Sequence, residues 1–259
     1  MKSKMFWIKS IAFLSLLFLF SCASRKDIVY YQDIDKIEDV GKESYEVKIQ
    51  PDDLLMIIVS ADDVEAALPF NLKTYSTSGN RLDITRGQET VQQYLVDFEG
   101  NIEFPVLGKI KVGGLSRTEV LHLLQSKISS YIKNPIINLR ITNFKISLQG
   151  EINMPGTYSV ASERITLIEA LSMGKDLTVY GKRNNILIIR ETNGKKSYNR
   201  VNITKSDFIN SPFYYLAQND VVYVEPNKTK VNSSAVGPNT SVIISAVSIL
   251  VSLSVLIFK

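Results

Sequence analysis

The sequence has one cysteine and one histidine among 259 residues. A single cysteine excludes a disulfide framework within the chain and any zinc or iron–sulfur site built from several cysteines. A single histidine, His122, excludes sites with several histidine ligands and leaves little acid–base chemistry near neutral pH. The chain also has no phosphate loop, no G-x-S-x-G and no dinucleotide fingerprint. The sequence therefore indicates no enzyme, no metal site and no cofactor.

An excess of charge of one sign is also lacking. The chain has 30 lysines and arginines against 26 aspartates and glutamates. Lys2, Lys4 and Lys9 precede a predicted cleavage site, and their removal leaves 27 basic side chains against 26 acidic ones. A nearly neutral mature chain gives no electrostatic basis for binding nucleic acid.

Residues 1–21 are predicted to be a lipoprotein signal peptide. Lysines at the start precede a short apolar run, which is typical of a secretory signal and too short to span a bilayer. The run ends in Leu19-Phe20-Ser21-Cys22, which resembles a bacterial lipobox. Acylation of Cys22 would anchor the chain to membrane lipid, at about 0.8 kcal/mol per buried CH₂. Residues 22–46 then form a lipidated N-terminal tether, and the absence of aspartate just after Cys22 favours the outer membrane.

Residues 241–259 are predicted to be a transmembrane helix that follows a linker over 227–240, because the stretch from 242 to 258 carries no charge. Four serines share one face of this helix: Ser241, Ser245, Ser248 and Ser252. Three interpretations of this stripe stay open. A lone anchor helix bonds its serines back to its own backbone, a packing face of small residues meets neighbouring helices, and a pore-lining stripe surrounds water. The last two imply an assembly of several copies.

Between the two ends, the pattern predicts two successive α+β units. In residues 47–145 we expect a strand pair over 46–49 and 54–59 and a hairpin over 94–105. A capping box, Ser116 with Glu119, opens a helix. The run over 54–59 has no alternation and is predicted to be buried on both faces.

Residues 146–226 are predicted to form a unit of the β-grasp type. A second capping box, Thr166 with Glu169, opens a short helix that ends at Gly174. The Asn193-Gly194 pair predicts a hairpin between strands on either side.

These motifs resemble a known family of exporters. Residues 47–141 resemble the polysaccharide export domain, through IQPDDL at 49–54, YLVDFEGNI at 94–102, FPVLG at 104–108 and YIKNP at 131–135. Residues 146–225 resemble one soluble-ligand-binding β-grasp (SLBB) domain, through QGEINMPGTY at 149–158 and LIEAL at 167–171. One departure concerns the turn at Asp52, where the family often has glycine. The order of lipobox, two domains and terminal helix is similar to that of the Wza-type outer-membrane lipoproteins.

The resemblance implies a homo-oligomeric ring, commonly of eight subunits. Its terminal helices would cross the outer membrane, and its soluble domains would lie in the periplasm. Capsular polysaccharide or exopolysaccharide would pass through the ring to the exterior, delivered by an inner-membrane co-polymerase or chain-length regulator. The alternative from another class is a monomeric, membrane-anchored glycan-binding lipoprotein without a pore.

Overall fold

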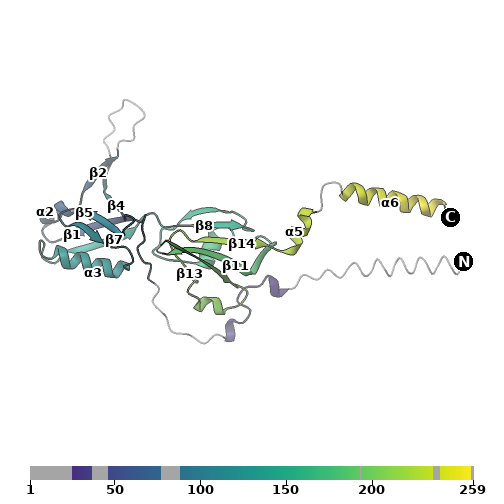
Figure 1. Cartoon of the computed structure of the whole chain (residues 1–259), viewed down its shortest axis with the longest axis horizontal. Helices are drawn as coiled ribbons and strands as arrows, with labels where there is room; N and C mark the ends of the chain where they lie inside the picture. The colour runs from purple at the N-terminus through teal and green to yellow at the C-terminus, as the bar shows by residue number, and fades with distance from the viewer. Residues whose placement is uncertain (1–24, 37–45, 77–87, 193, 236–239, 258–259) are drawn as a thin grey trace, which may run out of the picture.

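The computed structural model describes residues 25–36, 46–76, 88–192, 194–235 and 240–257. Two α+β units follow one another along the chain (Figure 1). We call residues 46–142 the first unit and residues 144–226 the second unit. Each has a hydrophobic core of its own, and no buried core residue is shared between them.

The first unit is built on a three-stranded antiparallel sheet in the order β4-β1-β7. Its strands are β1 (Leu54–Ser60), β4 (Gln93–Leu95) and β7 (Ile136–Ile141). Two hairpins accompany this sheet: β2 (Lys73–Ser76) with β3 (Gln88–Val91), and β5 (Asn101–Phe104) with β6 (Gly108–Lys111). The helical elements are α2 (Val64–Ala67), η3 (Leu68–Phe70) and α3 (Arg117–Ile128).

Helix α3 begins where the sequence predicts. The Ser116 side chain accepts a hydrogen bond from the Glu119 N–H at 3.2 Å, and the Glu119 carboxylate accepts one from the Ser116 N–H at 2.7 Å. This reciprocal pair satisfies two backbone groups that the first helical turn leaves free. The helix packs on β7 and buries Val120, Leu124 and Ile128 completely.

Two predictions of strand pairing in the first unit are wrong. Residues 46–49 form no hairpin with β1; instead, Lys48 makes an isolated bridge with Ser116. Strand β4 pairs with β1, and β5 turns back onto β6. The burial of β1 alternates along its length, so only one of its faces is fully buried. Local alternation and turn residues could not reveal the partners of Lys48 and of β1, because these come from distant parts of the chain.

The second unit has a mixed five-stranded sheet in the order β12-β11-β14-β8-β9. The strands are β8 (Lys145–Gly150), β9 (Gly156–Ser159), β11 (Gly181–Thr192), β12 (Lys195–Val201) and β14 (Val221–Pro226). The β14–β8 pair is parallel, and the other pairs are antiparallel. Smaller elements complete the unit: β10 (Ile165–Thr166), α4 (Leu167–Met173), η4 (Asp207–Asn210) and β13 (Tyr215–Leu216).

Two local features of the second unit agree with the sequence. Thr166 and Glu169 form the predicted capping box, and α4 ends with Gly174 as its cap. Gly150 has a φ of +85°, and a Cβ at this position would overlap the Val224 carbonyl oxygen on the neighbouring strand. Glycine is therefore required where β8 leaves its parallel partner.

Residues 25–36, which we call the N-terminal strap, pack on the second unit rather than on the first. The strap contains η1 (Arg25–Asp27) and η2 (Ile34–Lys36). The Tyr31 ring stacks on Phe208 with centroids 5.5 Å apart, and the Tyr30 hydroxyl donates to Asp176 Oδ1 at 2.6 Å. Asp33 Oδ1 accepts from the Ser206 N–H and hydroxyl at 2.7 and 2.6 Å. Part of the predicted tether is thus ordered on the second unit.

The C-terminal part requires a correction. The linker over 227–240 contains α5 (Lys228–Ala235), and α6 spans Thr240–Ile257. In the described part of the chain, none of the helices has both the length and the apolar character needed to cross a membrane. The predicted transmembrane helix is therefore wrong. The 18 residues of α6 give a length of about 27 Å, less than a hydrocarbon core of about 30 Å, and five serines interrupt their apolar surface.

Candidate functional site at the junction of the two units

Asn143 joins the two units through both its side chain and its backbone. Its side-chain amide donates to the Asp52 carbonyl oxygen at 2.8 Å, and its side-chain oxygen accepts from the Leu54 N–H at 2.9 Å. Its backbone oxygen accepts from the Gln218 side chain of the second unit at 2.9 Å. One residue therefore fixes the position of the second unit relative to the start of β1.

A buried polar cluster surrounds this contact. Asp53 and Gln218 are almost completely buried, at 0% and 2% exposure. Asp53 Oδ2 accepts from the Gln50 N–H at 2.8 Å, whereas Oδ1 has no hydrogen-bond partner within the described residues. Burial, aided by the negative charge of Asp52, raises the pKa of Asp53 to about 6. The junction thus contains a carboxyl group that titrates under mildly acidic conditions.

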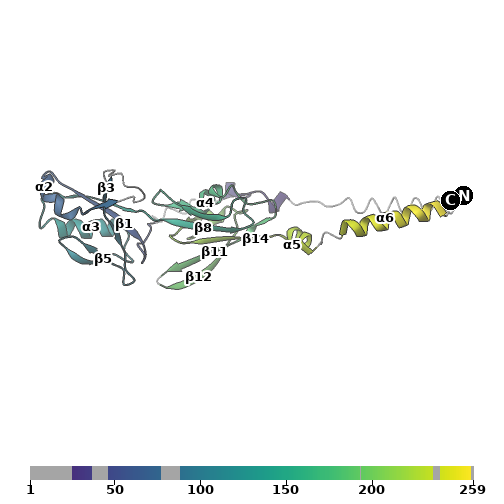
Figure 2. The same ribbon diagram turned by 90° about the horizontal axis from the view of Figure 1, so that it is seen from above.

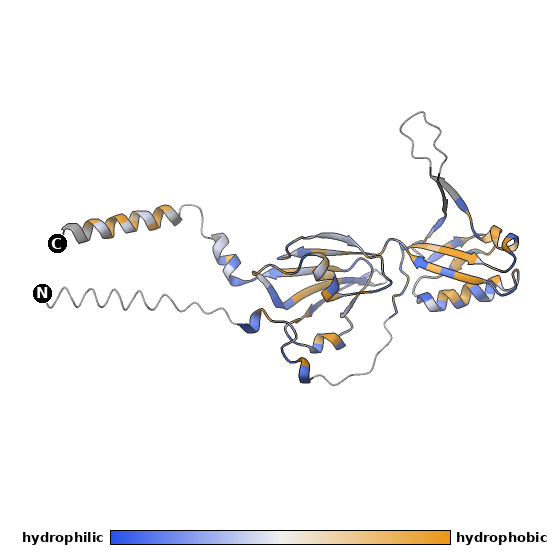
Figure 3. Cartoon of the chain, turned by 180° about the vertical axis from the view of Figure 1, so that it is seen from behind, coloured by the Kyte–Doolittle hydropathy of each residue, from blue (hydrophilic) through white to orange (hydrophobic). Residues whose placement is uncertain are grey.

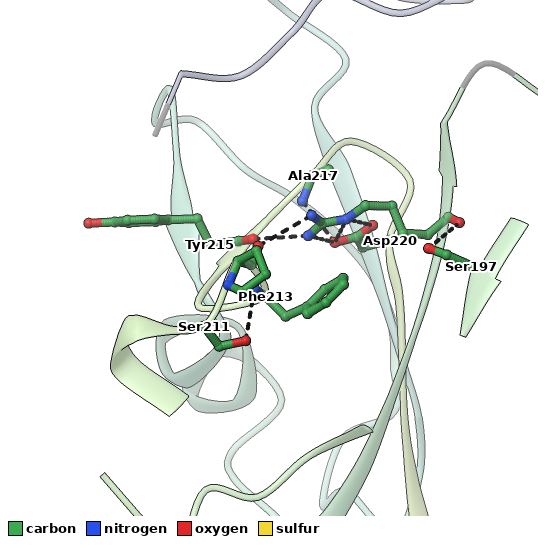
Figure 4. Close-up of polar contacts among 8 residues, drawn as sticks. Ser197, Ser211, Phe213, Tyr215, Ala217 and Asp220 are labelled. Carbon is green, nitrogen blue, oxygen red and sulfur yellow. Dashed lines mark hydrogen bonds and ion pairs between the residues drawn. The ribbon is translucent and has the colours of Figure 1, made fainter. Parts of the chain in front are cut away.

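The loop that presents Gln218 is held by a buried ion pair, drawn in Figure 4. Arg190 Nη2 donates to Asp220 Oδ2 at 2.7 Å and to the Tyr215 carbonyl oxygen at 2.9 Å. The Asp220 carboxylate also accepts from the Ala217 N–H at 2.8 Å. Burial raises the pKa of Asp220, and the Arg190 guanidinium partly offsets that effect. This pair connects β11 to the loop between β13 and β14.

A cleft of about 410 Å³ opens between the units beside this cluster. Its charged walls come from Glu46, Arg117 and Arg140 of the first unit and from Glu163 and Arg164 of the second. Hydroxyl groups of Thr118 and Ser162 and apolar side chains also line it, including Val47, Ile141 and Phe144. The lining combines charge, hydroxyl groups and apolar surface.

Contacts across the cleft tie its two walls together. Arg117 Nε lies 3.3 Å from Glu163 Oε1 and donates to the Leu139 carbonyl oxygen at 2.9 Å. Arg140 Nη2 donates to the Ala161 carbonyl oxygen at 3.2 Å. The Arg164 guanidinium lies over the Tyr215 ring, 5.1 Å from its centroid. The exposed Arg117–Glu163 pair contributes at most about 1 kcal/mol, so these contacts orient the walls more than they stabilise the protein.

The chemistry of the cleft suits binding better than catalysis. Guanidinium groups recognise carboxylates, and hydroxyl groups can exchange hydrogen bonds with other hydroxyl groups. Among the residues that the structure describes, no three His, Cys, Asp or Glu side chains come close enough to hold a metal ion.

Among the residues that the structure describes, those predicted from the sequence as functional lie on α6, away from this junction. Cys22 is outside the described residues. Ser248 and Ser252 donate to the carbonyl oxygens of Ile244 and Ser248, at 2.8 and 2.9 Å, within α6. Such bonding back to the helix was one of the three interpretations of the stripe, and it satisfies a serine hydroxyl without a partner helix. His122 is exposed on α3.

The sequence did not single out the arginines of the cleft. Arg140 stands on the polar side of an alternating strand, and Arg117 follows a helix cap. Both positions are ordinary for solvated charge, so only the contact between units reveals their role.

Comparison with known proteins addresses the family. Residues 41–142 match the family model described as polysaccharide biosynthesis/export protein. The chain carries a domain of the polysaccharide export family. It is 31% identical over 202 residues to the EPS I polysaccharide export outer membrane protein EpsA of Ralstonia solanacearum, and 29% identical over 202 residues to the protein of the same name from Ralstonia nicotianae.

These two alignments each cover 74% of this chain and 52% and 51% of the relatives, so the chain spans about half their length. The similarity extends beyond the 41–142 region into further parts of the chain, because 202 aligned residues exceed that region. Both relatives are named for export, which supports the prediction that this chain is not an enzyme.

Proposed function

We propose that the chain is a subunit of an outer-membrane assembly that exports polysaccharide, with its soluble units in the periplasm. The observation that carries this proposal is the family match over the first unit, together with the similarity to two outer-membrane export proteins. Acylation at Cys22 would supply the lipid anchor, and the apolar run that precedes this cysteine supports it. Residues 146–226 would serve as an SLBB domain, a role that the mixed sheet and α4 support.

The assembly would be a homo-oligomeric ring, of eight subunits in the form that the family resemblance implies. Helix α6 supports association, because its apolar side chains between Val242 and Leu253 are exposed. Figure 3 shows hydrophobic residues recurring along this helix. Val242, Ile244 and Leu250 are each more than 60% exposed. Packing of α6 helices from several copies, with the serine stripe at their contacts, would remove this surface from water.

The junction between the units would give each subunit a fixed shape. A closed ring needs the same angle between neighbouring subunits at every interface. Asn143, Gln218 and the Arg117–Glu163 contact hold the two units at one angle. Capsular polysaccharide or exopolysaccharide, handed over by an inner-membrane co-polymerase or chain-length regulator, would then pass along the ring axis.

The native mass of the full-length protein, extracted in mild detergent and imaged as particles, tests this proposal. A version that ends at Thr240 is the matched control for the contribution of α6. We expect a discrete multimer for the full chain and a smaller or less stable one for the truncated chain. A monomer in several detergents would contradict the ring and favour a membrane-anchored glycan-binding lipoprotein.

A second readout concerns export itself. In the native host, loss of this chain should move polysaccharide from the cell surface to the periplasm, and the full-length chain should restore it. Unchanged surface polysaccharide in the deletion strain would contradict an export function.

A further inference from the structure

We propose that the end of the second unit at which η1 and α5 lie binds the surface of an anionic phospholipid membrane. Figure 2 shows η1 and α5 at this end, opposite to the first unit. The Asn227 N–H, just before α5, donates to the Tyr180 carbonyl oxygen at 2.7 Å, and η1 contacts β11, which begins one residue after Tyr180. The inference rests on the proposed outer-membrane location but not on the ring.

Exposed apolar side chains gather at this end. Val179 is 74% exposed, Val231 is 53% exposed and Ile28 is 49% exposed, and the Tyr180 ring carries the Lys230 ammonium 5.2 Å from its centroid. We define the end surface as these four residues together with four basic ones, Arg25, Lys26, Lys228 and Lys230. Apolar and tyrosine side chains beside lysines are typical of segments that lie at a membrane interface.

The basic residues of the end surface are Arg25 and Lys26 of η1 and Lys228 and Lys230 of α5. All four are exposed. Among the described residues, Arg25, Lys26 and Lys228 form no ion pair, and Lys230 has only a distant one with Glu151, at 4.0 Å. Each basic residue near an anionic bilayer contributes about 1 kcal/mol of attraction.

Most of the nearby acidic groups are already engaged. Glu225 binds Lys182 at 3.0 Å and Arg200 at 2.7 Å, and these cations lower its pKa to about 2. Asp176 accepts from the Tyr30 hydroxyl, and Glu151 accepts from the Thr178 hydroxyl at 2.6 Å. Asp27 is the exposed acid of η1. Hydroxyl donors leave Asp176 and Glu151 negatively charged, so together with Asp27 three acidic groups stand against the four basic residues of the end surface, and Glu225 is outnumbered by its own two cations.

The strap fixes the basic residues in place. Tyr31 on Phe208 and Asp33 on Ser206 hold the strap on the second unit, and the Gln32 side chain donates to the Lys26 carbonyl oxygen at 2.7 Å. Cys22 is three residues before Arg25, so a lipid on this cysteine would be attached at most about 11 Å of extended chain from η1. The same end would then face the bilayer that holds the lipid.

Vesicle binding tests the electrostatic part of this proposal. The mature chain, residues 22–259 with Cys22→Ser, would be sedimented with vesicles of phosphatidylcholine alone or with one quarter phosphatidylglycerol. We expect binding to the anionic vesicles to be at least about tenfold tighter, and the preference to fall at high salt. Substituting glutamine at the four basic positions of the end surface should bring the ratio near one.

The matched control carries glutamine at four exposed lysines elsewhere, namely Lys127, Lys133, Lys195 and Lys196. It should keep the preference for anionic vesicles. Equal losses in both variants, or no preference in the parent chain, would overturn the proposal. Because α6 is unchanged in every variant, its own affinity for lipid cancels in the ratio.

A fluorescence measurement tests the orientation. In the mature chain, which contains no tryptophan, Val179→Trp should shift its emission to shorter wavelength on anionic vesicles, because the indole leaves water. Ile136→Trp, at a 71% exposed position of the first unit, should not shift. Equal shifts at both positions, or none at Val179→Trp, would contradict this orientation. A monomer in detergent would contradict the ring but would not change these vesicle results. The two proposals can therefore be contradicted independently.

Discussion

Each unit of the protein buries one aspartate completely, but the two are held differently. Asp220 of the second unit has the Arg190 guanidinium at hydrogen-bond distance, whereas Asp53 of the first unit has the Gln50 N–H and the Gln218 side chain beside it but no cation partner within the described residues. A buried carboxylate costs several kcal/mol unless a cation or several donors compensate it. The second unit therefore uses its aspartate to fix a loop, and the first unit keeps its aspartate in a state that pH can change.

Removing the cation from the second unit should have the largest effect. Arg190→Leu leaves the buried Asp220 carboxylate without its cation, with the Ala217 N–H as a remaining donor, and releases the Tyr215 carbonyl oxygen. We expect the free energy of unfolding of the second unit to fall by about 3–5 kcal/mol. Urea denaturation combined with hydrogen exchange of β11 and β14 would measure it. Arg200→Leu removes a half-exposed pair with Glu225 and should cost less than about 1 kcal/mol; equal losses would show that the buried pair has no special role.

Removing the titratable carboxyl group of Asp53 from the first unit should change how the free energy of unfolding depends on pH. Between its ordinary pKa of 3.8 and its raised pKa of about 6, folded Asp53 keeps a proton that the unfolded chain has lost. The free energy of unfolding should therefore fall as pH rises through this window, by up to about 3 kcal/mol. Asp53→Asn should abolish that decrease.

Denaturation midpoints measured from pH 4 to 7 would test this expectation. Asp97→Asn is the control, because hydrogen bonds from Asn101 lower the pKa of Asp97 and place its effect at lower pH. A slope that is unchanged in Asp53→Asn would mean that Asp53 stays ionised in the folded protein.

The strap allows a third comparison of the two units, because its contacts should stabilise only the second unit. Tyr31→Ala removes the ring that stacks on Phe208 and should lower the stability of the second unit by about 1–2 kcal/mol. Proteolysis within residues 25–45 should become faster, while hydrogen exchange in β1 and β7 stays constant. Tyr198→Ala, at a 65% exposed position, should change neither. Protection lost in both units would mean that the strap supports the junction as well.

The smallest effect concerns the turn beside Asp53. Asp52 has a φ of +69°, in the left-handed region where glycine is unstrained. Asp52→Gly should raise stability by about 0.5–1 kcal/mol and lower the pKa of Asp53, because a neighbouring negative charge is removed. Asp62→Gly, whose φ is not positive, should lose stability in the same thermal unfolding experiment. A loss in both variants would show that Asp52 is not strained.

The sequence predicted the features that depend on neighbours along the chain. Both capping boxes, the α+β class and the hairpin around Asn193-Gly194 are confirmed, because each depends on residues a few positions apart. The position of Lys48 beside Ser116 and the pairing of β4 with β1 depend on contacts between distant segments. The lack of charge in the terminal helix predicts a membrane span, but the short length of the helix and its five serines oppose that prediction.

The junction could not be predicted for the same reason. Arg117 and Glu163 are 46 positions apart, and each has the appearance of a solvated surface residue. The local signal at the junction is Pro51-Asp52-Asp53. Asp52 stands there at a turn position that is often glycine in the related family. The strap was predicted as a tether because tyrosines in a polar segment give no indication of their partner.

The strap also changes the topology of the connection between the units. Residues 30–33 belong to the second unit by their contacts, yet residues 46–142 follow them and the chain returns at Asn143. The first unit is thus an insertion, fastened at both its ends to the same support. Because the polypeptide passes between the units twice, one proteolytic cut in either passage would leave the two units covalently linked by the other passage.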